Sequence, residues 1–376
     1  MSLPLFFYSD ALLGYNMGPK HPMRPERLRM THDLMAAYGL PGTAVEVVAP
    51  TPATPEEVEE IHSRSYVEML RRLEFGDPVK GMQNYGFGGG DNPIFPGMFS
   101  ASLLYTGASA NAAQAILDGA GGGQVAFNIA GGLHHAHINC AAGFCVLNDC
   151  AVAVQRLQRK YSRVAYVDID VHHGDGVQEL FYTDNKVLTV SLHESGRTLF
   201  PGTGFTNEIG EGAGEGYCVN LPFAPHTTDE IWLDAWRSAA LPLLRAFDPE
   251  AIVLQMGTDA HDLDPLAHTS LSSQGWLEAI KDVRDLGKPI VAVGGGGYNL
   301  TTVTRMWTQA VATLTGIDLA DDIPKTYAHR RAGLTTLSDH YKPAASAQQV
   351  EFARNFASAS VDEIKSLLFA RNGLAL

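Results

Sequence analysis

The chain has 376 residues, which is enough for one large α/β domain or two smaller ones. Its composition, 45% hydrophobic and 18% charged, is typical of a soluble globular protein with a large core. The formal net charge of −14 argues against direct binding to nucleic acid and would favour cationic partners, although an acidic surface more often serves solubility.

Three features predict a cytoplasmic protein without a membrane anchor. Residues 1–8 are apolar but lack a basic leader, and we interpret them as a first core strand rather than a signal peptide. Residues 92–148 carry only one charge, Asp118, yet they are rich in Gly, Ala, Ser and Asn, which favours buried helix and loop over a membrane span. No C-x-x-C pair occurs, so we expect free thiols rather than a zinc ribbon or disulfides at Cys140, Cys145, Cys150 and Cys218.

Short apolar runs, bounded by Gly or Pro and separated by helix-length segments, predict an α/β fold. Helices on both faces of a mainly parallel sheet would explain why the runs are continuously apolar. The predicted strands are residues 5–8, 45–48, 125–129, 164–171, 187–192, 252–256 and 290–293.

Helix starts are marked by capping residues and by proline. Thr54 to Glu57 and Thr227 to Glu230 both have the form of a capping box, and a helix from Pro25 should reach residue 38. A C-terminal helix is predicted over residues 348–369. Because no repeat or linker interrupts the chain, we expect one domain over residues 1–376. Its core would span residues 5–315, and a C-terminal helical segment would span residues 325–376.

The most informative segment is residues 166–176, which we predict to continue a strand towards its carboxyl end. Alternation along a strand would point Asp168, Asp170 and His172 to one face. Two carboxylates and an imidazole on a buried face need a cation or a hydrogen-bond network. This donor set suits Zn²⁺ or another first-row divalent ion, and the alternative is a strand-end charge cluster in a loop crevice.

Polar residues also follow other predicted strands, at the edge of a parallel sheet where ligands bind. His134 and His135 follow two glycines, and one of them could act as a base, although a surface histidine cluster is an equal alternative. Asp259 comes just after the strand over 252–256, where a lone acid is more often a helix N-cap.

Two further loops favour a ligand crevice. Four glycines precede Tyr298, but they lack the G-x-G-x-x-G spacing of a nucleotide loop; instead they allow a tight bend that projects the Tyr298 hydroxyl into the crevice. Residues 199–204 form a stiff turn with an aromatic wall, although ordinary core packing is an equal alternative for Phe144 and Phe200.

Taken together, these motifs resemble the zinc-dependent histone deacetylases in order and spacing. The resemblance covers residues 5–315, and residues 21–30 are similar to the class I enzymes. It implies the arginase-deacetylase fold, a three-layer α/β/α sandwich around a mainly parallel eight-stranded sheet. The wider family includes bacterial acetoin-utilisation proteins and acetylpolyamine amidohydrolases. The motifs are His134-His135, Gly143-Phe144-Cys145, Asp168 to Gly176, Phe200 to Gly204, Asp259 and Gly294 to Tyr298.

The resemblance implies a catalytic metal site at Asp170, His172 and Asp259. It would hold Zn²⁺, or Fe²⁺ in the cell, with positions left for water and the substrate carbonyl. His135 would be the general base for that water and the acid for the leaving amine, with His134 as its electrostatic neighbour.

The same resemblance assigns the groups around the two histidines. Asp168 and Asp175 resemble the carboxylates that orient His134 and His135, and so set their tautomers and basicity. Tyr298 would donate to the oxyanion of the tetrahedral intermediate.

The resemblance also implies a substrate tunnel. Phe144 and Phe200, with Gly143 beside them, would enclose the acyl-lysine stem, and Asp91 would hold the backbone amides of the substrate. Leu266 stands where one polyamine-selective branch has an acidic gatekeeper, which makes a polyamine preference less supported but not excluded.

An internal channel and two K⁺ sites are implied as well. Arg27 matches an arginine of a channel linked to acetate exit. One K⁺ site would involve Asp168, Asp170, His172, Ser191 and Leu192. The other would lie near Phe181, Val187 and Tyr217.

The predicted function is therefore hydrolysis of an N-acyl amide by a metal-activated water, most of all acetyl-lysine on a protein or peptide. The absence of a G-x-S-x-G elbow disfavours serine hydrolysis.

One alternative is an acetylpolyamine or small-molecule amidohydrolase. An arginase-like ureohydrolase with two manganese ions would need more ligands, and a non-catalytic acyl-lysine binder would be expected to lose a ligand, the base or the tyrosine. No basic tail follows the predicted fold, so nuclear localisation and co-repressor partners are not carried over.

Overall fold

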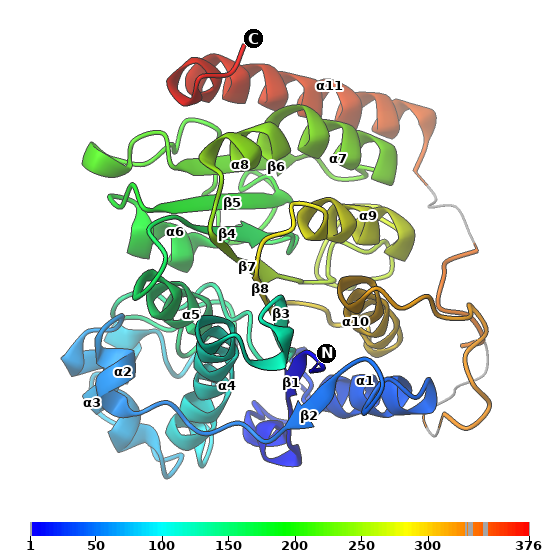
Figure 1. Ribbon diagram of the computed structural model, residues 1–376. Coiled ribbons are helices and arrows are strands. Elements are labelled where there is room, and N and C mark those ends of the chain that lie inside the picture. Colours follow the sequence, from blue (N-terminus) through cyan, green and yellow to red (C-terminus); the bar gives the residue numbers. More distant parts are fainter. Residues whose placement is uncertain (1, 328, 330–333, 341–344, 376) are drawn as a thin grey trace.

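One β-sheet of eight strands forms the centre of the computed structural model, which describes residues 2–327, 329, 334–340 and 345–375 (Figure 1). The strand order is β2-β1-β3-β8-β7-β4-β5-β6, and every neighbouring pair is parallel. The strands are β1 (Leu5–Phe7), β2 (Glu46–Val48), β3 (Val125–Asn128), β4 (Val164–Asp168), β5 (Val187–Glu194), β6 (Cys218–Phe223), β7 (Ala251–Gln255) and β8 (Ile290–Val293).

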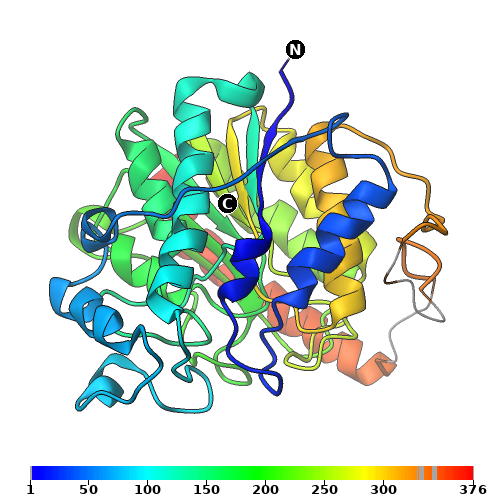
Figure 2. The ribbon, with the colours of Figure 1, turned by 90° about the horizontal axis from the view of Figure 1, so that it is seen from below.

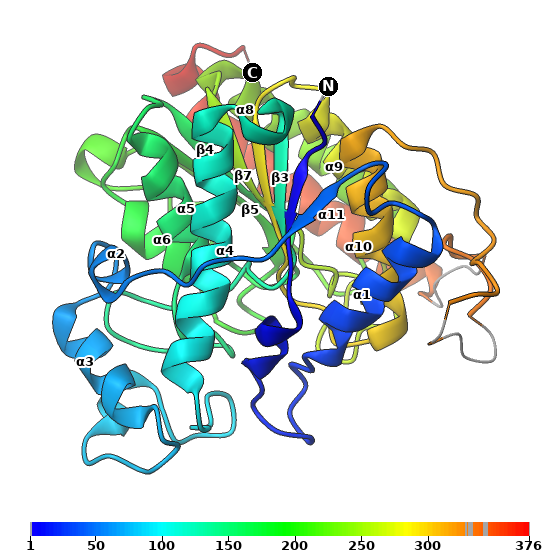
Figure 3. The same ribbon diagram turned by 60° about the horizontal axis from the view of Figure 1, so that its bottom comes forward.

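Helices cover both faces of this sheet, as Figure 2 and Figure 3 show. Tyr166 of β4 packs in a cluster with α4, α5 and α6, and its neighbour Val167 packs in the larger cluster on the other face. Because both sides of the central strands β3, β8, β7 and β4 are buried, these strands are apolar except at their ends, and the expected three-layer α/β/α fold is confirmed. The helices are α1 (Glu26–Ala37), α2 (Pro55–Glu59), α3 (Arg64–Leu73), α4 (Met98–Asp118), α5 (Asp149–Gln158), α6 (Asp175–Phe181), α7 (Asp229–Ala235), α8 (Leu241–Phe247), α9 (Ser273–Arg284), α10 (Leu300–Thr315) and α11 (Ala347–Ile364).

All seven predicted strands are present, but two details of the strand prediction are wrong. β6 was missed because Asn220 and Pro222 interrupt its apolar pattern. Proline is tolerated there because β6 is an edge strand of the sheet. In addition, β4 ends at Asp168 and not at residue 171, so Asp170 and His172 lie in the irregular segment that follows it.

Two of the predicted helix starts are confirmed and one is wrong. Thr54 makes the expected capping box with Glu57, and α1 begins directly after Pro25. At α7 the N-cap is Thr228, without a side-chain hydrogen bond, whereas the Thr227 hydroxyl donates to the carbonyl of Ala224 at 2.8 Å.

The C-terminal helix is also confirmed. α11 continues through a π-helical turn (Lys365–Phe369) and packs against β6 and α7 (Figure 1). Of the expected C-terminal segment, residues 328, 330–333, 341–344 and 376 lie outside the described residues, as does residue 1.

The weakly charged stretch before residue 148 contains α4, whose only charged residue is Asp118 at its last position. Its alanines, including Ala108, Ala112 and Ala113, are buried against the sheet. Across the described part of the chain, no helix has both the length and the hydropathy of a membrane span.

Candidate active site

The candidate catalytic residues come from the loops that follow four adjacent strands, β3, β8, β7 and β4. Since these strands are parallel, their carboxyl ends meet at one edge of the sheet. The loop after β3 carries His134 and His135, and that after β8 carries Tyr298. Asp259 follows β7, and the segment after β4 carries the remaining acids and His172.

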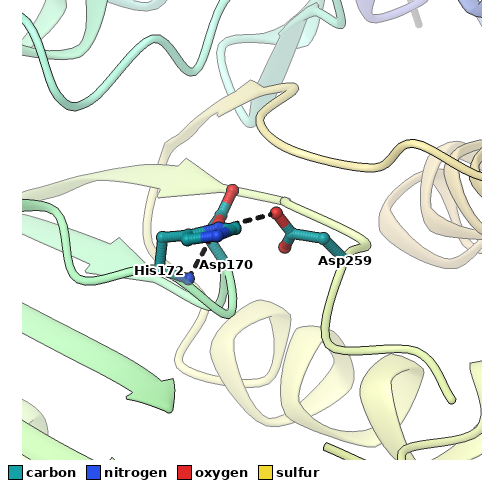
Figure 4. Close-up of side chains that lie close together, drawn as sticks. All are labelled: Asp170, His172 and Asp259. Atoms are coloured by element: carbon teal, nitrogen blue, oxygen red, sulfur yellow. Dashed lines mark hydrogen bonds and ion pairs between the residues drawn. The ribbon is translucent and has the colours of Figure 1, made fainter. Parts of the chain in front are cut away.

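Asp170, His172 and Asp259 converge on one point (Figure 4). Nδ1 of His172 lies 3.2 Å from Oδ1 of Asp170 and 3.0 Å from Oδ2 of Asp259, and all three residues are buried. The candidate ligand atoms lie within 4.8 Å of one another, which is close enough to share one ion. Among the described residues this is the one such group of three.

Each carboxylate of this cluster is also held by the protein. Oδ2 of Asp170 accepts hydrogen bonds from Nε2 of Gln255 at 2.8 Å and from the amide of Gly296 at 2.7 Å. Oδ1 of Asp259 accepts from the amide of Val171 at 2.9 Å. The other oxygen of each carboxylate is the one that faces His172, so the ligand set is preorganised.

The electrostatics of the cluster favour a cation. Burial and the nearby carboxylate of Asp170 raise the pKa of Asp259 to about 7. Burial opposes a charge on His172, but hydrogen bonds with Asp170 and Asp259 outweigh it and raise the pKa of His172 to about 10. A divalent cation would supply the positive charge that two close, buried carboxylates require, so the donor set fits a metal ion.

Two glycines allow this close packing. A Cβ atom on Gly257 would overlap Oδ2 of Asp170, and one on Gly296 would overlap Oδ2 of Asp259. We therefore expect Gly257→Ala to weaken metal binding by about tenfold or more, measured by chelator competition, because a displaced ligand loses its geometry. The matched control is Gly14→Ala, where the added Cβ meets nothing within 4 Å; equal affinity in both variants would contradict the expectation.

His134 and His135 form two carboxylate–imidazole pairs. Nδ1 of His134 lies 2.7 Å from Oδ2 of Asp168, and Nδ1 of His135 lies 2.6 Å from Oδ1 of Asp175. The two Nε2 atoms are 3.0 Å apart. The sequence-predicted pairing of each histidine with its acid therefore matches the contacts in the structure.

These pairs give the two histidines different protonation. Burial opposes a charge on His134, but the carboxylates of Asp168 and Asp170 outweigh it and raise the pKa of His134 to about 9. Burial and the neighbouring His134 lower the pKa of His135 to about 4. His135 is thus neutral near pH 7 and able to accept a proton.

A pocket of about 210 Å³ opens beside these groups. Phe144 packs edge-on against Tyr298, with ring centroids 5.7 Å apart, and Phe200 packs edge-on against His135 at 5.0 Å. Phe144 has a φ of 70°, and its carbonyl accepts a hydrogen bond from Tyr15 at 2.7 Å. The pocket is lined by Asp91, His135, Gly143, Phe144, His172, Leu199, Phe200, Leu266 and Tyr298.

Arg27 is buried beside the glycine run. Its Nη1 donates to the carbonyls of Gly295 at 2.9 Å and Gly297 at 3.1 Å, and its guanidinium lies 5.0 Å from the ring centre of Trp307. It also borders a small cavity between the N-terminal segment and the loop after β3. A channel for acetate at this position stays a prediction.

The expected K⁺ sites also stay predictions. Asp168 and Ser191 are register partners across β4 and β5, and Leu192 follows in β5. At the other end of these strands, Phe181 closes α6, Val187 opens β5, and the carbonyl of Tyr217 accepts from the amide of Thr189 at 3.0 Å.

Sequence reasoning missed several residues at the site. Gln255 touches Asp170, and the Tyr166 hydroxyl donates to Oδ2 of Asp168 at 2.6 Å. His137 lies 3.3 Å from Asp175 and 2.7 Å from Glu179. Two signals in the sequence could have identified these residues. Gln255 is a polar residue at the end of an apolar strand, and Tyr166 stands two positions before a predicted site residue, on the same side of the strand.

Comparison with known proteins agrees with this arrangement. The family model "Histone deacetylase domain" matches residues 21–314. The chain is 38% identical over 322 residues to histone deacetylase clr6 of Schizosaccharomyces pombe, covering 85% of this chain and 78% of that protein. It is 39% identical over 328 residues to the acetoin utilization protein AcuC of Bacillus subtilis, covering 85% and 84%.

The same relationship is seen in three dimensions. The structure of a histone deacetylase homologue from Aquifex aeolicus superposes with a TM-score of 0.84 at 32% identity, covering 96% of this chain and 100% of that one. Its fold, the family match and the convergence of the motifs agree, and the chain belongs to the histone deacetylase family of hydrolases.

Proposed function

We propose that this chain is a zinc-dependent deacylase that hydrolyses acetyl-lysine amides on proteins or peptides. The observation that carries the proposal is one pocket lined by His135, His172 and Tyr298 together with two phenylalanines. The relatives named as histone deacetylases support an acetylated amine as the substrate.

The metal would be held by Asp170, His172 and Asp259. When bound there, zinc would polarise the substrate carbonyl and lower the pKa of a water molecule. One imidazole and two carboxylates are common zinc ligands, and Fe²⁺ is an alternative with the same donors.

The protein groups then move the protons of the reaction. Neutral His135 accepts a proton from the attacking water as the new C–O bond forms, and Asp175 holds the resulting imidazolium. His135 returns this proton to the departing nitrogen as the C–N bond breaks, which releases acetate and the free amine. The Tyr298 hydroxyl donates to the oxygen on which negative charge develops.

The pocket walls position the substrate. Phe144 and Phe200 present ring surfaces that suit the aliphatic stem of acyl-lysine. Asp91 lies on the same lining, where its carboxylate can accept hydrogen bonds from substrate amides. Leu266, also on this lining, offers no charge for a second ammonium group, which favours acetyl-lysine over acetylpolyamine.

Tyr298→Phe is expected to lower kcat by roughly 10²–10³, because it removes one donor to the developing oxyanion. KM should change little, since the ring and its contact with Phe144 remain. Steady-state kinetics on an acetyl-lysine peptide measure this change. Tyr38→Phe is the control because the Tyr38 hydroxyl donates to the carbonyls of Ala320 and Asp322 and does not line the pocket. A kcat in Tyr298→Phe equal to that of the control would refute the assigned role.

The substrate class is tested by a panel of acetyl-lysine peptide, longer acyl-lysine peptides and acetylpolyamines at equal zinc. The proposal expects the highest kcat/KM on an acyl-lysine peptide. A higher kcat/KM on acetylpolyamine would change the proposed substrate from acetyl-lysine to a small acetylated amine, and the proposed mechanism would stay the same.

Two alternatives are less well supported. A ureohydrolase with two manganese ions needs a second ligand cluster, and the described residues contain one group of this kind. A binder without turnover would not need His135, its carboxylate partner and Tyr298 together. The number of metal ions bound per chain distinguishes the proposed deacylase from a ureohydrolase with two manganese ions. Hydrolysis of the acetyl-lysine peptide distinguishes it from a binder without turnover.

We also propose that the chain forms a single domain and that the protein is cytoplasmic. A continuous core that extends from Phe6 to Phe369 supports the single domain. Two further roles belong to the proposal. Arg27 would form part of an exit path for acetate, and the two K⁺ sites would be structural.

A further inference from the structure

Asp339 is a buried carboxylate outside the candidate site. It lies between α10 and α11, and its side chain is 3% exposed. Its Oδ1 accepts a hydrogen bond from Nη2 of Arg305 at 2.8 Å, and its Oδ2 accepts from the amide of Ser273 at 2.8 Å. Arg305 also donates to the carbonyl of Leu337 at 2.7 Å, so α10, the start of α9 and this segment are joined.

The same carboxylate reaches the loop that carries a candidate metal ligand. Oδ2 of Asp339 lies 3.0 Å from Nε2 of His261, two residues after Asp259. Nδ1 of His261 accepts a hydrogen bond from the amide of Leu263 at 3.1 Å, so the imidazole proton is on Nε2 and points to Asp339. The pair therefore has a defined direction and holds a fully buried imidazole.

The far end of this loop is tied to the candidate oxyanion donor. Oδ1 of Asp264 accepts from the amide of Leu266 at 3.0 Å, and Oδ2 accepts from the amide of Tyr298 at 2.7 Å. Nδ2 of Asn299 donates to the carbonyl of Leu263 at 3.1 Å. A displacement of the loop would therefore act on Asp259 and on Tyr298 together.

The stem of the loop is anchored separately. Nε1 of Trp307 donates to the carbonyl of Met256, and Nε1 of Trp276 donates to that of Gly257, each at 2.8 Å. These indoles hold the end of β7, whereas the contact through His261 lies beyond Asp259. The two anchors thus lie on either side of the candidate ligand.

We propose that Asp339 is a positioning residue of the candidate active site, which holds the loop after β7 through His261 and so sets where Asp259 and Tyr298 stand. The inference rests on the proposed function. It adds a residue from the segment between α10 and α11 to the residues that determine metal affinity and turnover.

The test compares Asp339→Asn with Asp321→Asn. Asp321 holds the same segment, through the amide of Ser338 at 2.7 Å and Nε2 of His340 at 2.9 Å, but these contacts do not reach the loop after β7. Asp339→Asn should weaken zinc binding by the metal-free chain by about tenfold, measured by chelator competition, at the lower end of what outer partners of metal ligands contribute. At saturating zinc its kcat should fall with KM nearly unchanged, and Asp321→Asn should match the wild type in both measurements.

A second variant keeps the test decisive if Asp339→Asn fails to fold. His261→Ala keeps the Arg305–Asp339 pair and removes the imidazole that links Asp339 to the loop, so it should show the same loss of zinc affinity and kcat. The inference about Asp339 would be overturned if His261→Ala kept the wild-type zinc affinity and kcat, or if Asp339→Asn and Asp321→Asn lost both equally. Either result would leave the proposed function standing. A wild-type chain that neither binds zinc nor hydrolyses the peptide would overturn the proposed function as well.

Discussion

Removing the metal with a strong chelator is expected to abolish hydrolysis of an acetyl-lysine peptide, and zinc added back is expected to restore it. Without a cation, the carbonyl is not polarised and no water is acidified, so the protein groups alone should leave only residual turnover. The buried carboxylates of Asp170 and Asp259 also lose the charge that offsets their repulsion. Unfolding followed by fluorescence should therefore give a lower Tm for the metal-free chain than for the zinc-loaded chain.

The control for this experiment is the same chelator already saturated with zinc, which should leave both activity and Tm unchanged. A titration of the metal-free chain with zinc should saturate at one ion per chain. Full activity after the metal content has been shown to fall to zero would eliminate the proposed mechanism.

His135→Ala is expected to lower kcat by roughly 10²–10⁴, the usual contribution of a positioned general base. The variant loses the group that accepts and returns the proton, and Asp175 loses its 2.6 Å partner. Zinc affinity should stay close to that of the wild type because His135 is not one of the three candidate ligands. Kinetics on the acetyl-lysine peptide and zinc titration measure the two effects separately.

His340→Ala is a matched control for this substitution. It removes a histidine whose side chain is 64% exposed and paired with Asp321 at the surface, and its turnover should match the wild type. If His135→Ala turned over as fast as His340→Ala, another group would have to be the base. If His135→Ala also lost zinc, its role would be structural as well as catalytic.

Much of the fold was predictable because both faces of the sheet are covered. Strands such as β4 and β7 are apolar at every position before their last, which is Asp168 in β4 and Gln255 in β7, and such runs are visible without knowledge of their neighbours. β6 was not predictable in this way, because an edge strand tolerates Asn220 and Pro222. The sequence also predicted the end of β4 three residues too late, because Ile169 and Val171 continue its apolar pattern beyond the last residue that pairs with β5 and β7.

The candidate site was predictable to a similar degree. His135, Asp170 and Asp259 each stand a few residues after a strand, in motifs whose order and spacing resemble a known family. The false N-cap at Thr227 shows the limit of such local signals. The chain turns there through a contact with Ala224, and the helix begins one residue later than the pattern indicates.

The sequence by itself determined the class of fold, the residue types of the candidate site and the chemistry that they suit, because these depend on local patterns and on donor chemistry. The tertiary structure alone decided the strand order that brings β3, β8, β7 and β4 together. It also decided the packing of Gly257 against Asp170 and the link from Asp339 to His261. Those contacts join residues that are 87 and 78 positions apart, and no local pattern records which distant segment folds against which.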